Sequence, residues 1–67
     1  MTTPKYPQVR VTLTGTDGNA FAVLGAVNVA LKRAGIDKIE RDAFFAEATA
    51  GNYDHLLQTA MRWVEVA

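Results

Sequence analysis

The stretch NAFAVLGAVNVALKRAG, residues 19–35, has almost no polar face, and it decides how the rest of the chain must be arranged. Asn19 has the short polar side chain that caps a helix N-terminus, and Gly35 is the residue type that most often follows a helix C-terminus. With both end signals present, the stretch predicts a helix over residues 20–34.

Two apolar faces run along this predicted helix. The first has the three- and four-residue spacing of a core-facing stripe. It consists of Phe21, Leu24, Val27 and Leu31. The second is a face of small residues, namely Ala22, Ala26 and Ala30, with Val29 beside them. Since a chain of 67 residues has little material to cover both, we expect the alanine face to contact either the chain's own remaining elements or a second copy.

Length and composition limit the class of protein. A chain of 67 residues forms one domain, and at this size folding hides only about 60% of the extended chain's surface. The absence of cysteine excludes disulfides and thiolate metal sites and fits a reducing cytoplasm. Seven basic and seven acidic residues give zero net charge, which disfavours nucleic acid as a partner. With no bilayer-length apolar stretch and no signal-peptide core, we expect a cytoplasmic protein without membrane contact.

The N-terminal part of the chain predicts an arm followed by a strand. Residues 1–7 contain two prolines and are expected to form a flexible arm. Residues 8–14 include VRVTLT, which alternates with the period of a half-buried strand. The turn GTDG, residues 15–18, leads into the helix. Because it matches no phosphate-binding motif and carries the negative charge of Asp17, a plain turn is favoured over an anion site.

A second helix is predicted over residues 38–50. Asp37 precedes it in the N-cap position. Its inner stripe is expected to be Ile39, Ala43 and Ala46. Phe44 and Phe45 are adjacent, so their side chains point about 100° apart. One of the two is therefore expected at the margin of the core or in an interface.

A third helix and a closing strand are predicted at the C-terminal end. Asn52 caps the helix, which covers residues 53–62. Its apolar side is expected to be Leu56, Leu57, Ala60 and Met61. The following WVEV, residues 63–66, alternates like a short strand, although continuation of the helix through Val64 is the open alternative.

These elements predict an α+β fold of order β-α-α-α-β in a single domain over residues 8–67. The two strands, far apart in the sequence, would pair across the body of the domain, with Arg10 opposite Glu65. Such a short ribbon needs helices on one face, which the intervening segment provides. The sequence leaves open whether the strands run parallel or antiparallel.

No constellation of residues in the sequence indicates catalysis or metal binding. His55 is the only histidine, and although Asp54 precedes it, neighbouring helical residues point in different directions. A surface or hydrogen-bonded structural histidine is therefore favoured over an acid/base pair. The carboxylates do not have the spacing of a metal site. We expect no enzyme, no cofactor and no metal.

Several segments resemble a family of very short proteins found in bacteria and their phages. The most specific are DGNAF at residues 17–21, YDHLL at residues 53–57 and RWVEV at residues 62–66. The resemblance covers nearly the whole chain after the N-terminal arm. It implies a phage-associated accessory protein of the cytoplasm, and because it implies no particular activity it carries over no site residues.

The leading interpretation is a small, non-enzymatic interaction module. The surplus of apolar helical surface indicates that it self-associates, for example as a homodimer, or docks on a larger protein. The expected interface residues are Ala22, Ala26, Val29, Ala30 and Phe45. A small-ligand pocket between the helices is less favoured, because it would compete with the core for the same apolar residues.

The alternative is a DNA-binding protein resembling the ribbon-helix-helix class, in which the paired strands of a dimer enter the major groove. The residues that would read bases from the first strand are Arg10, Thr12 and Thr14. Zero net charge and the third helix count against this alternative. Pairing of the first strand with WVEV in the same chain would remove the intermolecular ribbon.

Overall fold

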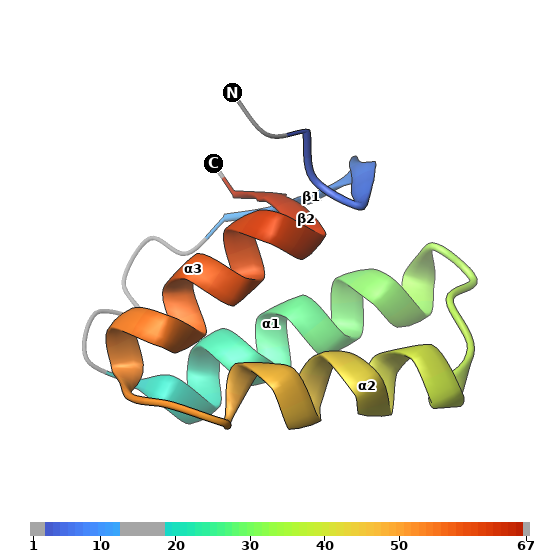
Figure 1. Ribbon diagram of the computed structural model, residues 1–67. Helices are drawn as coiled ribbons and strands as arrows, with labels where there is room; N and C mark the ends of the chain where they lie inside the picture. Colours follow the sequence, from blue (N-terminus) through green and yellow to red (C-terminus); the bar gives the residue numbers. More distant parts are fainter. Residues whose placement is uncertain (1–2, 13–18, 67) are drawn as a thin grey trace.

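A computed structural model describes residues 3–12 and 19–66, and it contains the predicted elements in the predicted β-α-α-α-β order (Figure 1). The elements are β1 (Tyr6–Val11), α1 (Ala20–Arg33), α2 (Lys38–Ala48), α3 (Tyr53–Trp63) and β2 (Val64–Val66). β1 begins at Tyr6 rather than at residue 8, and Trp63, which was predicted to open the second strand, ends α3. Leu13, Thr14 and the GTDG turn lie outside the described residues.

The three helices begin where the sequence predicts because each has a side chain that caps its first turn. In each case the cap oxygen accepts a hydrogen bond from the backbone N–H three residues later. The pairs are Asn19 with Ala22 at 3.0 Å, Asp37 with Glu40 at 2.9 Å and Asn52 with His55 at 2.9 Å. At the other end of α1, Gly35 has a φ of 85°, a conformation that glycine adopts without steric cost.

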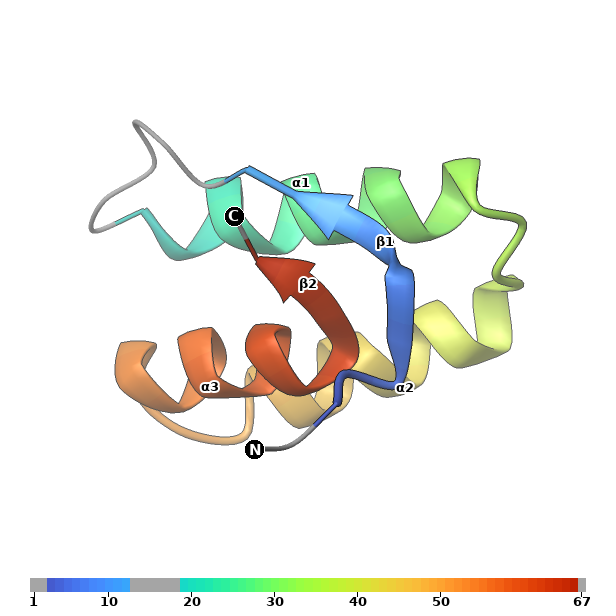
Figure 2. The same cartoon turned by 90° about the horizontal axis from the view of Figure 1, so that it is seen from above.

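The two strands lie side by side and run parallel (Figure 2). Arg10 is in register with Glu65, which confirms the predicted cross-strand pair, and Val11 is in register with Val66. Pairing is irregular between Tyr6 and Arg10, in the segment where Pro7 has no N–H to donate. Because parallel strands cannot be joined by a tight turn, the three helices together form the crossover between them.

The core lies between the sheet and the helices. In Figures 1 and 2 the sheet covers one side of α1 and α3, and α2 lies on the far side. Val9 and Val11 point from β1 toward the helices, so the predicted alternation is confirmed over the described residues 9–12. The buried apolar residues are Val9, Val11, Val23, Leu24, Val27, Leu31, Phe44, Ala48, Leu56, Ala60, Trp63 and Val64.

The predicted core stripe of α1 is wrong at one position. Leu24, Val27 and Leu31 are buried, but Phe21 is 84% exposed. The buried side of the helix is turned toward Val23, which is fully buried. Since successive helical residues are about 100° apart, Phe21 points about 160° away from Val23 and therefore toward solvent.

The predicted inner stripe of α2 is also wrong. Ile39 is 81% exposed, and Ala43 and Ala46 are exposed as well. The buried residues are Phe44 and Ala48 instead. The Phe44 ring packs edge-on against Trp63, with ring centroids 5.5 Å apart. This large aromatic contact sets which side of α2 faces inward and leaves Ile39, Ala43 and Ala46 outside.

The apolar side of α3 is confirmed only in part. Leu56 and Ala60 are buried and Leu57 is half-buried, but Met61 is 59% exposed. Thr59, a polar residue, takes a fully buried position instead.

Lys5, which precedes β1, and Tyr6, which begins it, are held against the helices. The backbone N–H of Lys5 donates to the carbonyl oxygen of Arg62 at 2.8 Å. The Lys5 ammonium forms an ion pair with Glu40 of α2 and lies 4.4 Å from the centroid of the Trp63 ring. The Tyr6 hydroxyl donates to the same Glu40 carboxylate at 3.0 Å. These bonds, from Lys5 first and then Tyr6, lower the pKa of Glu40, while burial and then the Glu40 bond raise the pKa of Tyr6.

Candidate functional site

The candidate site is a groove between α1 and α2, which lie side by side and antiparallel on either side of the turn at Gly35 (Figure 1). Its volume is about 500 Å³. We call it the α1–α2 groove. It is lined by Phe21, Leu24, Gly25, Asn28, Lys38, Arg41, Asp42 and Phe45.

Two phenylalanines stand at the rim of this groove with much of their surface in water. Phe21 is 84% exposed and Phe45 is 53% exposed. The large exposed apolar residues of the described chain are Phe21, Val29, Ile39, Phe45 and Met61. All but Met61 belong to α1 and α2. Of these, Phe21 and Phe45 line the α1–α2 groove. Single exposed apolar residues are ordinary, but two exposed rings at one groove are typical of an interaction surface.

Charges of both signs border the α1–α2 groove. Lys38 and Asp42, one helical turn apart, form an exposed ion pair at 2.9 Å. Arg41 donates to the Asn28 side chain of α1 at 3.4 Å and to the backbone oxygen of Ile36 at 3.1 Å. Arg41 therefore links the two helices at one side of the groove, and Asn28 is exposed.

Gly25 lines the groove from the middle of α1, where the fold does not need a glycine. A Cβ placed there would meet no atom within 4 Å. Glycine inside a helix costs about 1 kcal/mol relative to alanine. The absent side chain leaves the helix backbone open to close approach from outside.

A second groove lies on the other flank of α1, against β1, and we call it the β1–α1 groove. Its volume is about 510 Å³. It is lined by Arg10, Val11, Thr12, Ala22, Gly25, Ala26, Val29, Ala30 and Arg33. The alanines are half-buried, so β1 covers this face only in part.

The two grooves divide the residues that the sequence singled out. Four of the predicted interface residues, Ala22, Ala26, Val29 and Ala30, line the β1–α1 groove, whereas Phe45 lines the α1–α2 groove. Arg10 and Thr12, the candidate base-reading residues, are exposed beside the alanines, and Thr14 lies outside the described residues. Sequence analysis missed Phe21 because its spacing from Leu24 matched a core stripe.

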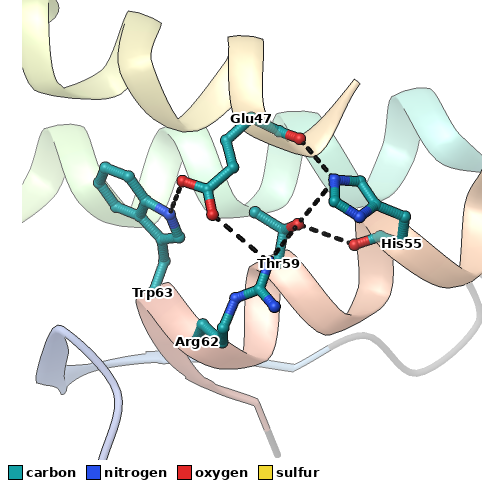
Figure 3. Close-up of polar contacts among 5 residues, drawn as sticks. All are labelled: Glu47, His55, Thr59, Arg62 and Trp63. Carbon is teal, nitrogen blue, oxygen red and sulfur yellow. Dashed lines mark hydrogen bonds and ion pairs between the residues drawn. The ribbon is translucent and has the colours of Figure 1, made fainter. Parts of the chain in front are cut away.

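His55 belongs to a polar cluster between α2 and α3 (Figure 3). Its ring Nε2 lies 2.8 Å from the backbone oxygen of Glu47. The Glu47 carboxylate accepts hydrogen bonds from the Trp63 indole at 3.2 Å and from Arg62 at 3.4 Å. The buried hydroxyl of Thr59 donates to the backbone oxygen of His55 at 2.8 Å and accepts from Arg62 at 3.3 Å.

The geometry of this cluster assigns its protons. A carbonyl oxygen only accepts, so the Nε2 atom of His55 carries a hydrogen. The Thr59 hydroxyl gives its single proton to the backbone, which leaves it to accept from Arg62. The cluster therefore joins α2 to α3, and His55 is hydrogen-bonded into it as the structural interpretation predicted. Within residues 3–12 and 19–66, no group of three or more histidine, cysteine, aspartate or glutamate side chains is arranged to hold a metal ion.

No protein-family model, curated protein or solved structure matches the chain. The resemblance to short bacterial and phage proteins therefore stays a prediction. Among the described helices, none is long and apolar enough to cross a membrane.

Proposed function

We propose that this domain is a non-enzymatic interaction module that self-associates through the α1–α2 groove. The observation that carries the proposal is the position of Phe21, an almost fully exposed aromatic side chain at the rim of an apolar recess. A projecting ring beside a recess is self-complementary. Under a two-fold axis, Phe21 of each copy enters the groove of the other, and the same patch serves both copies.

The charges at the margin of the groove support a second copy as the occupant. A two-fold arrangement brings each residue of one copy toward other residues of the same patch. Lys38 and Arg41 are positive and Asp42 is negative, so the patch carries both signs, although Lys38 and Asp42 already pair within the chain. A patch of one sign would repel itself.

Gly25 supports the same arrangement. Without a side chain at the groove floor, the helix backbone accepts a large ring from outside at close range. The chain retains this helix-weakening residue although its own packing leaves space for a Cβ. Close packing of a ring from a second copy over Gly25 would explain why a glycine stands at this position.

The structure favours this module over the DNA-binding alternative. β1 pairs with β2 of the same chain, so one of its two edges is not available for a ribbon between two copies. Arg10 is in register with Glu65, which places a negative residue beside the proposed base-reading arginine. Both observations weaken a role of this strand in the major groove.

Sedimentation velocity over a range of micromolar concentrations tests the proposal with two matched variants. Phe21→Ser removes the aromatic ring at the groove and should weaken self-association at least tenfold, because buried aromatic anchors dominate interface energies. Met61→Ser removes an exposed apolar residue of α3 that lines neither groove and should leave self-association unchanged. A wild-type protein that stays monomeric up to high micromolar concentration would overturn the proposal.

A further inference from the structure

The β1–α1 groove follows the unpaired edge of β1. The strand order of the described sheet is β1-β2, so β1 is paired along one edge only. The groove is lined by Arg10, Val11 and Thr12, three consecutive residues whose side chains alternate in direction, and by no residue of β2. It therefore lies along the backbone of the outer edge, where unpaired N–H and C=O groups can bond another strand.

The floor of this groove suits side chains rather than a helix. It is made of Ala22, Ala26 and Ala30, with Val29 at the side. These small residues leave room for apolar side chains that point down from an added strand. In such pairing the backbone supplies affinity and alternate side chains enter the floor.

Among the described residues that line the groove, the charged ones are both positive. They are Arg10 and Arg33, and both are exposed. Neither forms an ion pair within the described part of the chain. An occupant that carries carboxylates would neutralise them, whereas a basic occupant would be repelled.

On its other edge, β1 already pairs with a segment that alternates apolar and acidic residues. That segment is β2, which reads Val-Glu-Val, with Glu65 in register with Arg10. A similar segment on the outer edge would put its acidic side chain near Arg10 and its apolar side chains over the alanine floor.

We infer that the β1–α1 groove binds an extended acidic segment of a partner protein, which adds to β1 as a third strand. The occupant alternates apolar and acidic residues. A second copy of β1 does not fit this description, because it would bring another Arg10 to a groove that already holds two arginines. The inference uses a different flank of α1 from the α1–α2 groove, although Gly25 lines both grooves, and it does not depend on self-association.

The test uses a fluorescein-labelled short peptide of alternating valine and glutamate, titrated with the protein and followed by fluorescence anisotropy. A control peptide has lysine in place of each glutamate. The glutamate peptide should bind and the lysine peptide should not, and binding should weaken as salt is raised. In ¹⁵N-labelled protein, the peptide should shift the amide signals of residues 10–12 and 22–33.

Matched variants separate the groove from general charge effects. Arg33→Glu should weaken peptide binding about five- to tenfold, because one attraction becomes a repulsion. Lys32→Glu makes the same charge change on the neighbouring residue, which does not line the groove, and should change binding less than twofold. Arg10→Gln should weaken binding two- to fivefold, by loss of one attraction alone. Circular dichroism checks that each variant is folded.

Three results would overturn the inference. The first is equal binding of the glutamate and lysine peptides, and the second is equal loss of binding in Arg33→Glu and Lys32→Glu. The third is a set of groove signals that move with protein concentration alone in Phe21→Ser, because a second copy would then fill this groove rather than the α1–α2 groove. All measurements are repeated in Phe21→Ser, in which the proposed self-association is removed. Peptide binding in this variant is therefore measured independently of self-association through the α1–α2 groove.

Discussion

The junction between α2 and α3 is closed, whereas the junction between α1 and α2 is open. In the closed junction, the buried Phe44 ring meets Trp63, and the hydrogen bonds of Glu47 tie the outer side together. In the open junction, Phe21 and Phe45 stand at the rim of a groove of about 500 Å³. The chain thus exposes aromatic residues at one helix pair while it buries them at the next.

The difference shows what closes a junction in so small a domain. The closed pair combines an aromatic contact with a polar network around the buried Thr59, whose other members, Glu47 and Arg62, are partly exposed. No described side-chain N or O atom is both buried and unpartnered. Across the open pair, the Arg41 side chain bonds to Asn28 at 3.4 Å. We infer that the closed junction holds the monomer together and that the open junction is left for a second molecule.

The largest expected effect is a difference in stability between substitutions at two adjacent phenylalanines of α2. Phe44→Ala should lower the free energy of unfolding by about 3–5 kcal/mol, because it empties a fully buried aromatic site. Phe45→Ala should lower it by less than about 1 kcal/mol, because this ring is half in water. Urea unfolding followed by circular dichroism measures both. Equal losses would remove the distinction between the closed and the open junction.

Two glycines give the next effect, with opposite signs. A Cβ at Gly51 would lie 2.8 Å from the Cβ and Cγ atoms of His55, so Gly51→Ala must displace the ring that bonds to Glu47. We expect a loss of about 1–3 kcal/mol. Gly25→Ala meets no atom within 4 Å and should stabilise the monomer by up to about 1 kcal/mol.

The Gly25 variant also tests the open junction. If a second copy packs over this glycine, Gly25→Ala should weaken self-association while it raises the unfolding midpoint. Thermal unfolding and sedimentation velocity on the same samples measure the two effects. A change of both in the same direction would argue against close approach at Gly25.

The smallest expected effect is a pH dependence at the N-terminal segment. Lys5 and Tyr6 lower the pKa of Glu40 below its ordinary value of 4.5. The bonds of Lys5 and Tyr6 to the Glu40 carboxylate therefore stabilise the fold fully above this pH, and this stabilisation is lost as the pH falls through the lower folded-state pKa. From about pH 5 to about pH 3, wild type should lose slightly more stability than Glu40→Gln. The effect is small because Lys5 and Glu40 are partly exposed. Identical urea midpoint shifts in the two proteins would contradict it.

Sequence reasoning succeeded where local chemistry decides the structure. Asn19, Asp37 and Asn52 cap their helices as predicted, since a cap bonds only to its own first turn. The alternation of β1 and the pairing of Arg10 with Glu65 also followed from the sequence. These features depend on neighbours in the chain or on a strict period of two.

Sequence reasoning failed where the rotation of a helix depends on its partners. In α2 the spacing of Ile39, Ala43 and Ala46 resembles a core stripe, but the contact of Phe44 with Trp63 decides the buried side. The same reason explains Phe21, whose exposure creates the candidate site. A periodic pattern gives the width of an apolar face, but on a helix with several apolar faces it does not say which one is covered.

The central claim is that the open α1–α2 junction receives the Phe21 ring of a second copy. It is tested most directly by isotope-filtered nuclear Overhauser measurements on a mixture of labelled and unlabelled protein at a concentration where sedimentation detects dimers. The account predicts intermolecular contacts from the Phe21 ring to Leu24 or Phe45. Dimers whose intermolecular contacts map to α3 or to β1, with none from Phe21, would contradict it.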